Sequence, residues 1–105
     1  MTTPIWTIHA QRNVASVYEF IAQDSAIYAH RMVDRIEQAS LSAARQPESG
    51  GIVPEFDLRH IREVLAGNYR VIYRLLESGQ IEILAVIHGA RRLAFQLDDH
   101  TDSQQ

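Results

Sequence analysis

The sequence predicts an α+β domain: a short N-terminal strand, an antiparallel two-helix hairpin, and then a three-stranded antiparallel meander forming one sheet. Apolar residues follow a helical period before Pro47 and a period of two over residues 61–88. The breaks between the periodic segments are short, with Gly67-Asn68 and Ser78-Gly79 between the last three. Short breaks join neighbours in space, which favours a hairpin followed by a meander over two separate domains.

The first elements are indicated by one apolar pair and one capping residue. Ile5-Trp6 is typical of the end of a strand. Thr7 is expected to cap a helix, because its hydroxyl can accept a hydrogen bond from a free backbone N–H of the first turn. The apolar residues that share one face of this helix are Ala10, Val14, Val17, Tyr18 and Ile21. We expect the helix to end near Gln23.

A second helix follows after almost no connection. Asp24 or Ser25 is expected to cap it. Its apolar positions are Ala29, Met32, Val33, Ile36, Ala39 and Ala43. Pro47 and the Gly50-Gly51 turn end it. By their spacing, Trp6, Tyr18 and Met32 are expected to be core residues.

The three strands of the meander are expected over residues 61–65, 69–76 and 80–88. After Leu97 the chain has no further apolar residue. We therefore expect one domain over residues 1–95 and an acidic, disordered tail over residues 96–105.

Two-residue turns would set the register of the meander. Ile72 is then opposite both Glu63 and Ala85. The face expected to pack on the helices carries Arg62, Val64, Tyr69, Val71, Tyr73, Leu75, Leu84, Val86 and His88. On the other face, Glu63 is expected within reach of Arg70 and Arg74, as an ion-pair lattice that holds the register.

The same outer face is predicted to expose an isoleucine-rich patch. Its members are Ile61, Ile72, Ile81, Ile83 and Ile87. A folded monomer rarely exposes a contiguous apolar patch of this kind unless the patch binds something. Two interpretations are open: a loop or the tail of the chain covers the patch, or a partner protein or a second copy does.

Composition excludes several classes of protein. The chain has 105 residues, a formal net charge of −3, no cysteine and no lysine. A disulfide scaffold, a thiolate zinc site and a cysteine nucleophile are therefore excluded. The longest apolar run, residues 83–87, is far shorter than a membrane span, and no signal peptide is visible, so we expect a soluble, cytoplasmic protein. Residues 59–92 carry six arginines against three glutamates, an excess too small to indicate nucleic-acid binding by itself.

Several segments, taken in order, resemble one known family. They are Ile21-Ala22-Gln23-Asp24-Ser25, Val53-Pro54-Glu55, Ile61-Arg62-Glu63-Val64, the run from Gly67 to Arg74, and the run from Ile83 to Arg92, which ends in His-Gly-Ala-Arg-Arg. From about Thr3 to Leu93 the chain resembles the RelE/ParE toxins of type II toxin–antitoxin systems, also known as plasmid stabilisation proteins. The family's order of strands and helices agrees with the order predicted above.

This resemblance implies one of two activities. The RelE branch cleaves messenger RNA on the ribosome, without a metal or cofactor. The ParE branch poisons DNA gyrase. Members of both branches are held inactive by a cognate antitoxin that wraps around the toxin.

Part of the nuclease machinery of the RelE branch is missing. At the positions that match its lysines, this sequence has Ile61, which cannot transfer a proton, and Glu63, whose charge would repel a phosphate beside it. The matching arginines, Arg70 and Arg91, are present. The candidates for the tyrosine of that branch are Phe95 and Leu97, and neither can ionise.

Other residues have a structural and a functional interpretation. His88 could replace the missing acid–base group, or be a structural residue at a strand end. Arg91 and Arg92 are either a solvated strand end or part of a docking surface. Glu55 could pair with an arginine of the sheet, and we prefer this to a catalytic role.

The sequence therefore predicts a ParE-like toxin that inhibits gyrase without catalysis. Candidates for target binding are Arg70, Arg74, His88, Arg91 and Arg92. The isoleucine patch and the flank of the helical hairpin are the candidate antitoxin sites, receiving a helix in a groove or a strand at a sheet edge. A RelE-like nuclease using His88, Arg70 and Arg91 is one alternative, and a detoxified binding protein of the same fold is another. The sequence contains no P-loop, no HExxH pair and no catalytic-triad spacing, so nothing in it indicates a metabolic enzyme.

Overall fold

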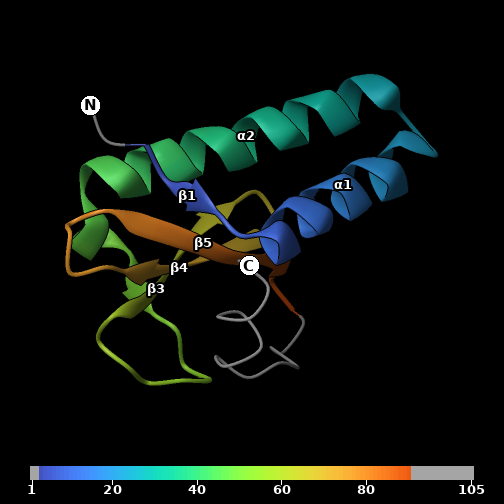
Figure 1. Ribbon diagram of the computed structural model, residues 1–105. Helices are drawn as coiled ribbons and strands as arrows, with labels where there is room; N and C mark the ends of the chain where they lie inside the picture. The colour runs from blue at the N-terminus through green and yellow to red at the C-terminus, as the bar shows by residue number, and fades with distance from the viewer. Residues whose placement is uncertain (1–2, 91–105) are drawn as a thin grey trace.

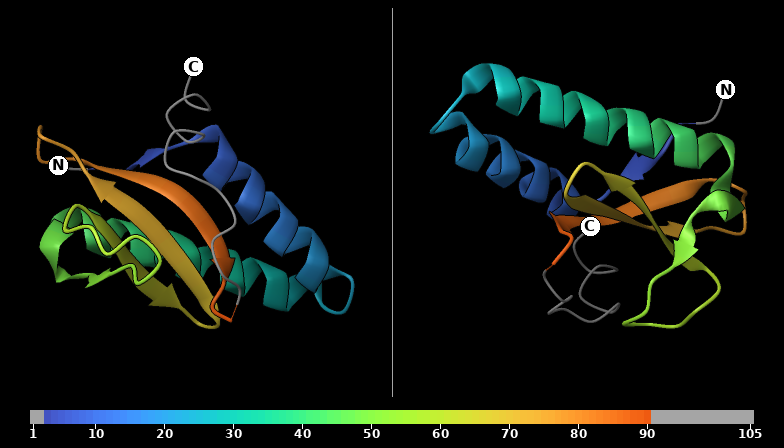
Figure 2. Two further views of the ribbon diagram at one scale, coloured as in Figure 1. Left: turned by 90° about the horizontal axis from the view of Figure 1, so that it is seen from below. Right: turned by 180° about the vertical axis from the view of Figure 1, so that it is seen from behind.

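A computed structural model describes residues 3–90 of the chain. Two helices pack on one face of a five-stranded sheet (Figures 1 and 2). The elements are β1 (Ile5–Trp6), α1 (Ile8–Ala22), α2 (Ala26–Arg45), the 3-10 turn η1 (Pro47–Ser49), β2 (Gly51–Ile52), β3 (Ile61–Ala66), β4 (Tyr69–Leu75) and β5 (Ile81–His88). The predicted fold class and element order are confirmed.

The sheet has the strand order β1-β5-β4-β3-β2. β1 runs parallel to β5, and the other neighbours are antiparallel. The sequence did not predict β2, because Gly51 belongs to the glycine pair Gly50-Gly51, which is typical of a turn. β2 pairs with Arg62 and Glu63, and so closes the outer edge of β3 over these two residues.

Both helices begin at the residues expected to cap them. The Thr7 hydroxyl accepts a hydrogen bond from the Ala10 N–H, and the Ser25 hydroxyl accepts one from the Tyr28 N–H. Thr7 also donates to the Ile83 carbonyl oxygen at 2.9 Å, which joins the start of α1 to β5. A buried side chain thus caps a helix and pins it to the sheet.

Tyr73 of β4 attaches the segment after α2 to the sheet. Its side chain is fully buried, and its hydroxyl donates to the Pro47 carbonyl oxygen at 2.7 Å and accepts from the Gly50 N–H at 3.2 Å. Burial raises the pKa of the Tyr73 phenol, although the Gly50 hydrogen bond and the charge of Arg62 partly oppose this.

The register predicted at the centre of the meander is confirmed. Ile72 is opposite both Glu63 and Ala85. A bulge follows, since Tyr73 pairs with Ile83, and Leu84 becomes an extra residue of β5. A bulge exchanges the faces of the residues on one side of it. Leu84 therefore joins the outer face rather than the helix-facing one.

The main core lies between the helices and the sheet. It contains Ile81 and Ile83, both fully buried, together with Tyr73 and the apolar faces of the helices. The prediction that these two isoleucines are exposed on the outer face is wrong, because the bulge turns them toward the helices. Met32 is buried as expected, while Trp6 and Tyr18 are partly buried against this core.

A second, smaller core covers the outer face. Its members are Val53, Ile61, Ile72, Leu84 and Ala85, with Phe56 and Ile87 packed against them. Val53 and Phe56 belong to the loop between β2 and β3, so this loop packs over the outer face. The interpretation in which a loop covers the isoleucines is confirmed for Ile61 and Ile72, which are fully buried and cannot be an exposed antitoxin site.

The predicted ion-pair lattice is correct for one arginine and wrong for the other. Glu63 pairs with Arg70, and Arg74 pairs with Glu82 instead. The bulge is the reason, because it turns Glu82 to the outer face, directly opposite Arg74. Glu82 is almost completely buried, so the pair is far less exposed than the sequence indicated. The expected tail, residues 96–105, lies outside the described residues.

Candidate functional site

A hollow of about 750 Å³ opens at the end of the sheet where β3 turns into β4. Its walls come from the β3–β4 turn, the ends of these two strands, the end of β5 and the loop before β3. The residues that line it are Pro54, Glu55, Glu63, Leu65, Gly67, Asn68, Arg70, His88, Gly89 and Ala90. The register places Leu65 opposite Arg70 on the outer face, whereas Tyr69 and His88, which are opposite each other, belong to the helix-facing side, so His88 borders the hollow from the end of β5.

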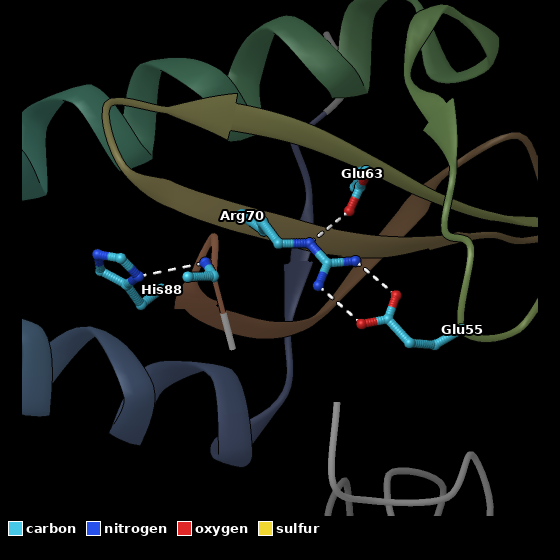
Figure 3. A network of polar contacts seen from close by, with 5 residues as sticks. Glu55, Glu63, Arg70 and His88 are labelled. Carbon is cyan, nitrogen blue, oxygen red and sulfur yellow. Dashed lines mark hydrogen bonds and ion pairs between the residues drawn. The ribbon is translucent and has the colours of Figure 1, made fainter. Parts of the chain in front are cut away.

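Arg70 is the cation at the centre of the hollow (Figure 3). Its two terminal nitrogens, Nη1 and Nη2, donate to the two carboxylate oxygens of Glu55 at 2.9 and 2.8 Å. Its Nε donates to Glu63 Oε1 at 2.7 Å. A planar guanidinium held by a carboxylate on both outer nitrogens is the strongest common geometry for an ion pair.

This cluster is only slightly accessible to water. The exposed fractions are 8% for the Arg70 side chain, 16% for Glu55 and 21% for Glu63. The hydrogen bond to Glu55 raises the pKa of Arg70 most, Glu63 adds to the effect, and burial opposes it. Counted over these three described side chains alone, two carboxylates stand against one guanidinium.

His88 stands at the rim of the hollow, at the end of β5. It is exposed, and its ring packs edge-on against Tyr69 with 5.6 Å between the ring centroids. Its Nδ1 lies 3.2 Å from the Ala90 N–H and accepts a hydrogen bond from it (Figure 3). This hydrogen bond places the proton of the neutral ring on Nε2, so neither nitrogen is an unoccupied acceptor.

The sequence-predicted site residues divide into three groups. Arg70 and His88 line the hollow together with Glu55, whose expected pairing with an arginine of the sheet is confirmed. Arg74 pairs with Glu82 and is not among the lining residues. Arg91 and Arg92 lie outside the described residues, directly after the lining residue Ala90.

Six lining residues were not identified from the sequence as parts of a site, namely Pro54, Leu65, Gly67, Asn68, Gly89 and Ala90. Leu65 is an apolar side chain with 69% of its surface exposed, and Asn68 belongs to the turn. The available signal was their position on either side of Gly67, which adopts a positive φ of 59°. Within residues 3–90, no group of three or more histidines or acidic residues is arranged to hold a metal ion. No helix of the same residues has the length and apolarity to span a membrane.

The fold of this chain is similar to solved structures of toxin–antitoxin proteins. One is the chromosomal ParDE TA system from P. aeruginosa, with a TM-score of 0.63 and 16% identity, covering 84% of this chain and 96% of that chain. Another is a YoeB/ParE toxin from Agrobacterium tumefaciens, with a TM-score of 0.58 and 22% identity, covering 83% and 98% of the two chains. Both likenesses show the same arrangement of helical hairpin and sheet.

Sequence comparison supplies the family. Residues 5–93 match the model of the family described as the ParE toxin of type II toxin–antitoxin system, parDE. The chain is also 29% identical over 91 residues to Toxin RelE2 of Caulobacter vibrioides, covering 87% of this chain and 99% of the relative. The chain belongs to the ParE toxin family, within the RelE/ParE superfamily, as the sequence predicted. Type II toxins of this kind pair with an antitoxin.

Proposed function

We propose that this toxin acts without catalysis, by binding DNA gyrase, and that its cognate antitoxin neutralises it. The observation that carries the proposal is the pairing of Arg70 with both Glu55 and Glu63. The arginine that would have to stabilise a phosphate is held by two carboxylates of the same chain.

The remaining groups of the hollow support the same conclusion. Cleavage of RNA without a metal needs a base for the 2′-hydroxyl, a cation for the phosphorane and an acid for the leaving oxygen. Ile61 is fully buried in the outer core, and Glu63 already accepts a hydrogen bond from Arg70. His88 accepts a backbone hydrogen bond with the nitrogen that a base would use.

One observation favours the nuclease alternative. His88 and Arg70 line the same hollow, as a replacement acid–base group and its cation would have to do. The two candidate functions differ in the target of the toxin, which is DNA gyrase in one case and messenger RNA on the ribosome in the other. Assays with purified components can therefore separate them.

The decisive pair of assays uses gyrase and programmed ribosomes. The chain should inhibit supercoiling of relaxed plasmid by purified gyrase in proportion to its concentration, and it should leave messenger RNA on the ribosome intact. A preparation in which the cognate antitoxin is bound is the matched control, and it should not inhibit. Codon-specific cuts that disappear in His88→Ala would reverse the assignment, while inactivity in both assays would favour a detoxified binding protein.

The antitoxin is proposed to contact the flank of the helical hairpin. Phe20 of α1 and Ile27 of α2 are each 68% exposed, which is unusual for large apolar side chains and typical of a protein interface. We expect Phe20→Ser with Ile27→Ser to reduce retention of a tagged antitoxin. The matched change Leu65→Ser, on the far side of the sheet, should leave retention unchanged. Equal retention by both variants would exclude the hairpin flank.

A further inference from the structure

Three arginines form a line along the exposed side of α2. Arg31, Arg35 and Arg45 are exposed, and the helical period places them on one face. The polar uncharged exposed residues on the same face are Tyr28, Gln38 and Ser42, and the exposed apolar Ile27 lies beside them. The three arginines and the three polar residues are called the basic stripe below. With a rise of 1.5 Å per residue, its three charges span about 21 Å. In Figure 1, α2 runs along the top of the molecule.

The stripe is not neutralised by the helix that carries it. Among the described residues, none of the three arginines takes part in an ion pair. The positions four residues before and after them hold no acidic residue, and Arg31 and Arg35 are four residues apart themselves. Like charges at this spacing destabilise a helix by about 0.2–0.5 kcal/mol.

One acidic residue of α2, Asp34, borders the stripe, about 60° from Arg31 around the helix axis. Asp34 is three residues after Arg31, a spacing at which ion pairs form, yet no such pair is present within residues 3–90. Glu37 is turned by about 120° from Arg31 around the helix axis. Within residues 3–90, α2 therefore carries three arginines outside any ion pair, and the spacing of Arg31 and Arg35 is itself unfavourable to the helix.

One arginine of the stripe lies close to the β3–β4 turn. A side chain built on Gly67 would come within 3.1 Å of Arg35 Nη1 and 2.9 Å of Met32 Cε. The Arg35 guanidinium thus rests on the β3–β4 turn, where the missing side chain of Gly67 leaves room for it.

We propose that the basic stripe of α2 is a docking site for an acidic segment of a protein partner. Arginine forks match carboxylates in two-point geometry, and the polar residues between them offer further hydrogen bonds. The extent of about 21 Å fits six or seven residues of extended chain. A nucleic acid fits less well, because a duplex covering the stripe would also approach Asp34 and Glu37 on the adjoining surface.

The test is direct binding of a labelled acidic peptide to the full chain, measured by fluorescence anisotropy. The probe is a peptide of about ten residues in which glutamate and serine alternate. Arg31→Gln with Arg35→Gln should weaken its binding about tenfold, whereas Arg12→Gln with Arg59→Gln, which removes two exposed arginines elsewhere, should change it less than about twofold. Arg45→Gln added to the first pair should weaken binding further.

Thermal unfolding shows that any loss of binding does not come from unfolding. The Arg31→Gln, Arg35→Gln variant should melt at the same temperature as the wild type or slightly above it, because a repulsive pair is removed. Equal peptide affinity of the two double variants would overturn the proposal. Tighter binding of a DNA duplex of about 20 base pairs than of the peptide, lost in the same variant, would assign the stripe to nucleic acid instead.

Discussion

Arg70 is a largely buried cation held by two carboxylates, and this pairing determines what the hollow can bind. Its partners come from different segments, Glu63 from the neighbouring strand and Glu55 from the loop that covers the outer core. The cluster therefore also fastens the loop to the sheet. The same residue that resembles a nuclease arginine has a structural task in this chain.

Glu55→Gln should destabilise the protein. The change removes a charge from a bidentate pair and leaves Arg70 largely buried with Glu63 as its remaining carboxylate, at a cost of about 2 kcal/mol. Urea unfolding should show a lower midpoint with an unchanged slope. Glu77→Gln, an exposed change of the same kind on the β4–β5 turn, is the control. Equal midpoints for the two variants would show that Glu55 does not hold the loop.

Tyr73 gives the protein a sensitivity to alkali. Because burial raises its pKa in the folded state, the unfolded chain releases this proton first, above about pH 10, and stability falls as the pH rises further. At neutral pH, Tyr73→Phe should lower the free energy of unfolding by about 1–2 kcal/mol, because two buried hydrogen bonds disappear. Above about pH 10, the free energy of unfolding of this variant should fall less with pH than that of the wild type. Tyr28→Phe, at an exposed position, should retain the wild-type pH dependence. Parallel curves for wild type and Tyr73→Phe would contradict the assignment.

At the scale of elements, the helices followed from the sequence more closely than the strands. A helical period and a capping hydroxyl are local signals, so both N-caps and both helix ends could be predicted. The bulge in β5 depends on how Tyr73 and Leu84 pack between two cores, and no local signal gives its position. It moved Ile81, Ile83 and Leu84 to the opposite faces from those predicted.

The two helix caps should differ in their contribution to stability. Thr7 is buried and bonds both to its own helix and to β5, whereas Ser25 is exposed and bonds only within α2. Thr7→Ala should therefore cost about 2 kcal/mol and Ser25→Ala about 1 kcal/mol. Thermal or urea unfolding of the two variants measures the difference. A larger loss for Ser25→Ala would mean that the link between Thr7 and the sheet contributes little.

On the scale of the whole molecule, the fold buries most of the isoleucine patch that the sequence predicted to be exposed. Four of the five outer-face isoleucines are fully buried, two under the helices and two in the outer core. The candidate site could be predicted in part, because Arg70, His88 and Glu55 are named by type and position. The hollow itself could not, because its shape depends on a loop that has no periodic pattern and on the turn at Gly67.

The surfaces that remain for partners are the hollow, the hairpin flank and the basic stripe. The hollow lies at the end of the sheet, whereas the hairpin flank and the basic stripe share α2, so the sheet and the helices present different surfaces to partners. This separation agrees with a toxin that acts by binding.

The central claim, inhibition of gyrase without catalysis, is tested most directly by the state of the DNA itself. Purified chain is incubated with gyrase, ATP and supercoiled plasmid, the proteins are denatured, and linear DNA is measured. We predict that linear DNA accumulates with the dose of the toxin and that bound antitoxin prevents this. Intact plasmid at every dose, together with loss of messenger RNA from programmed ribosomes under the same conditions, would contradict it.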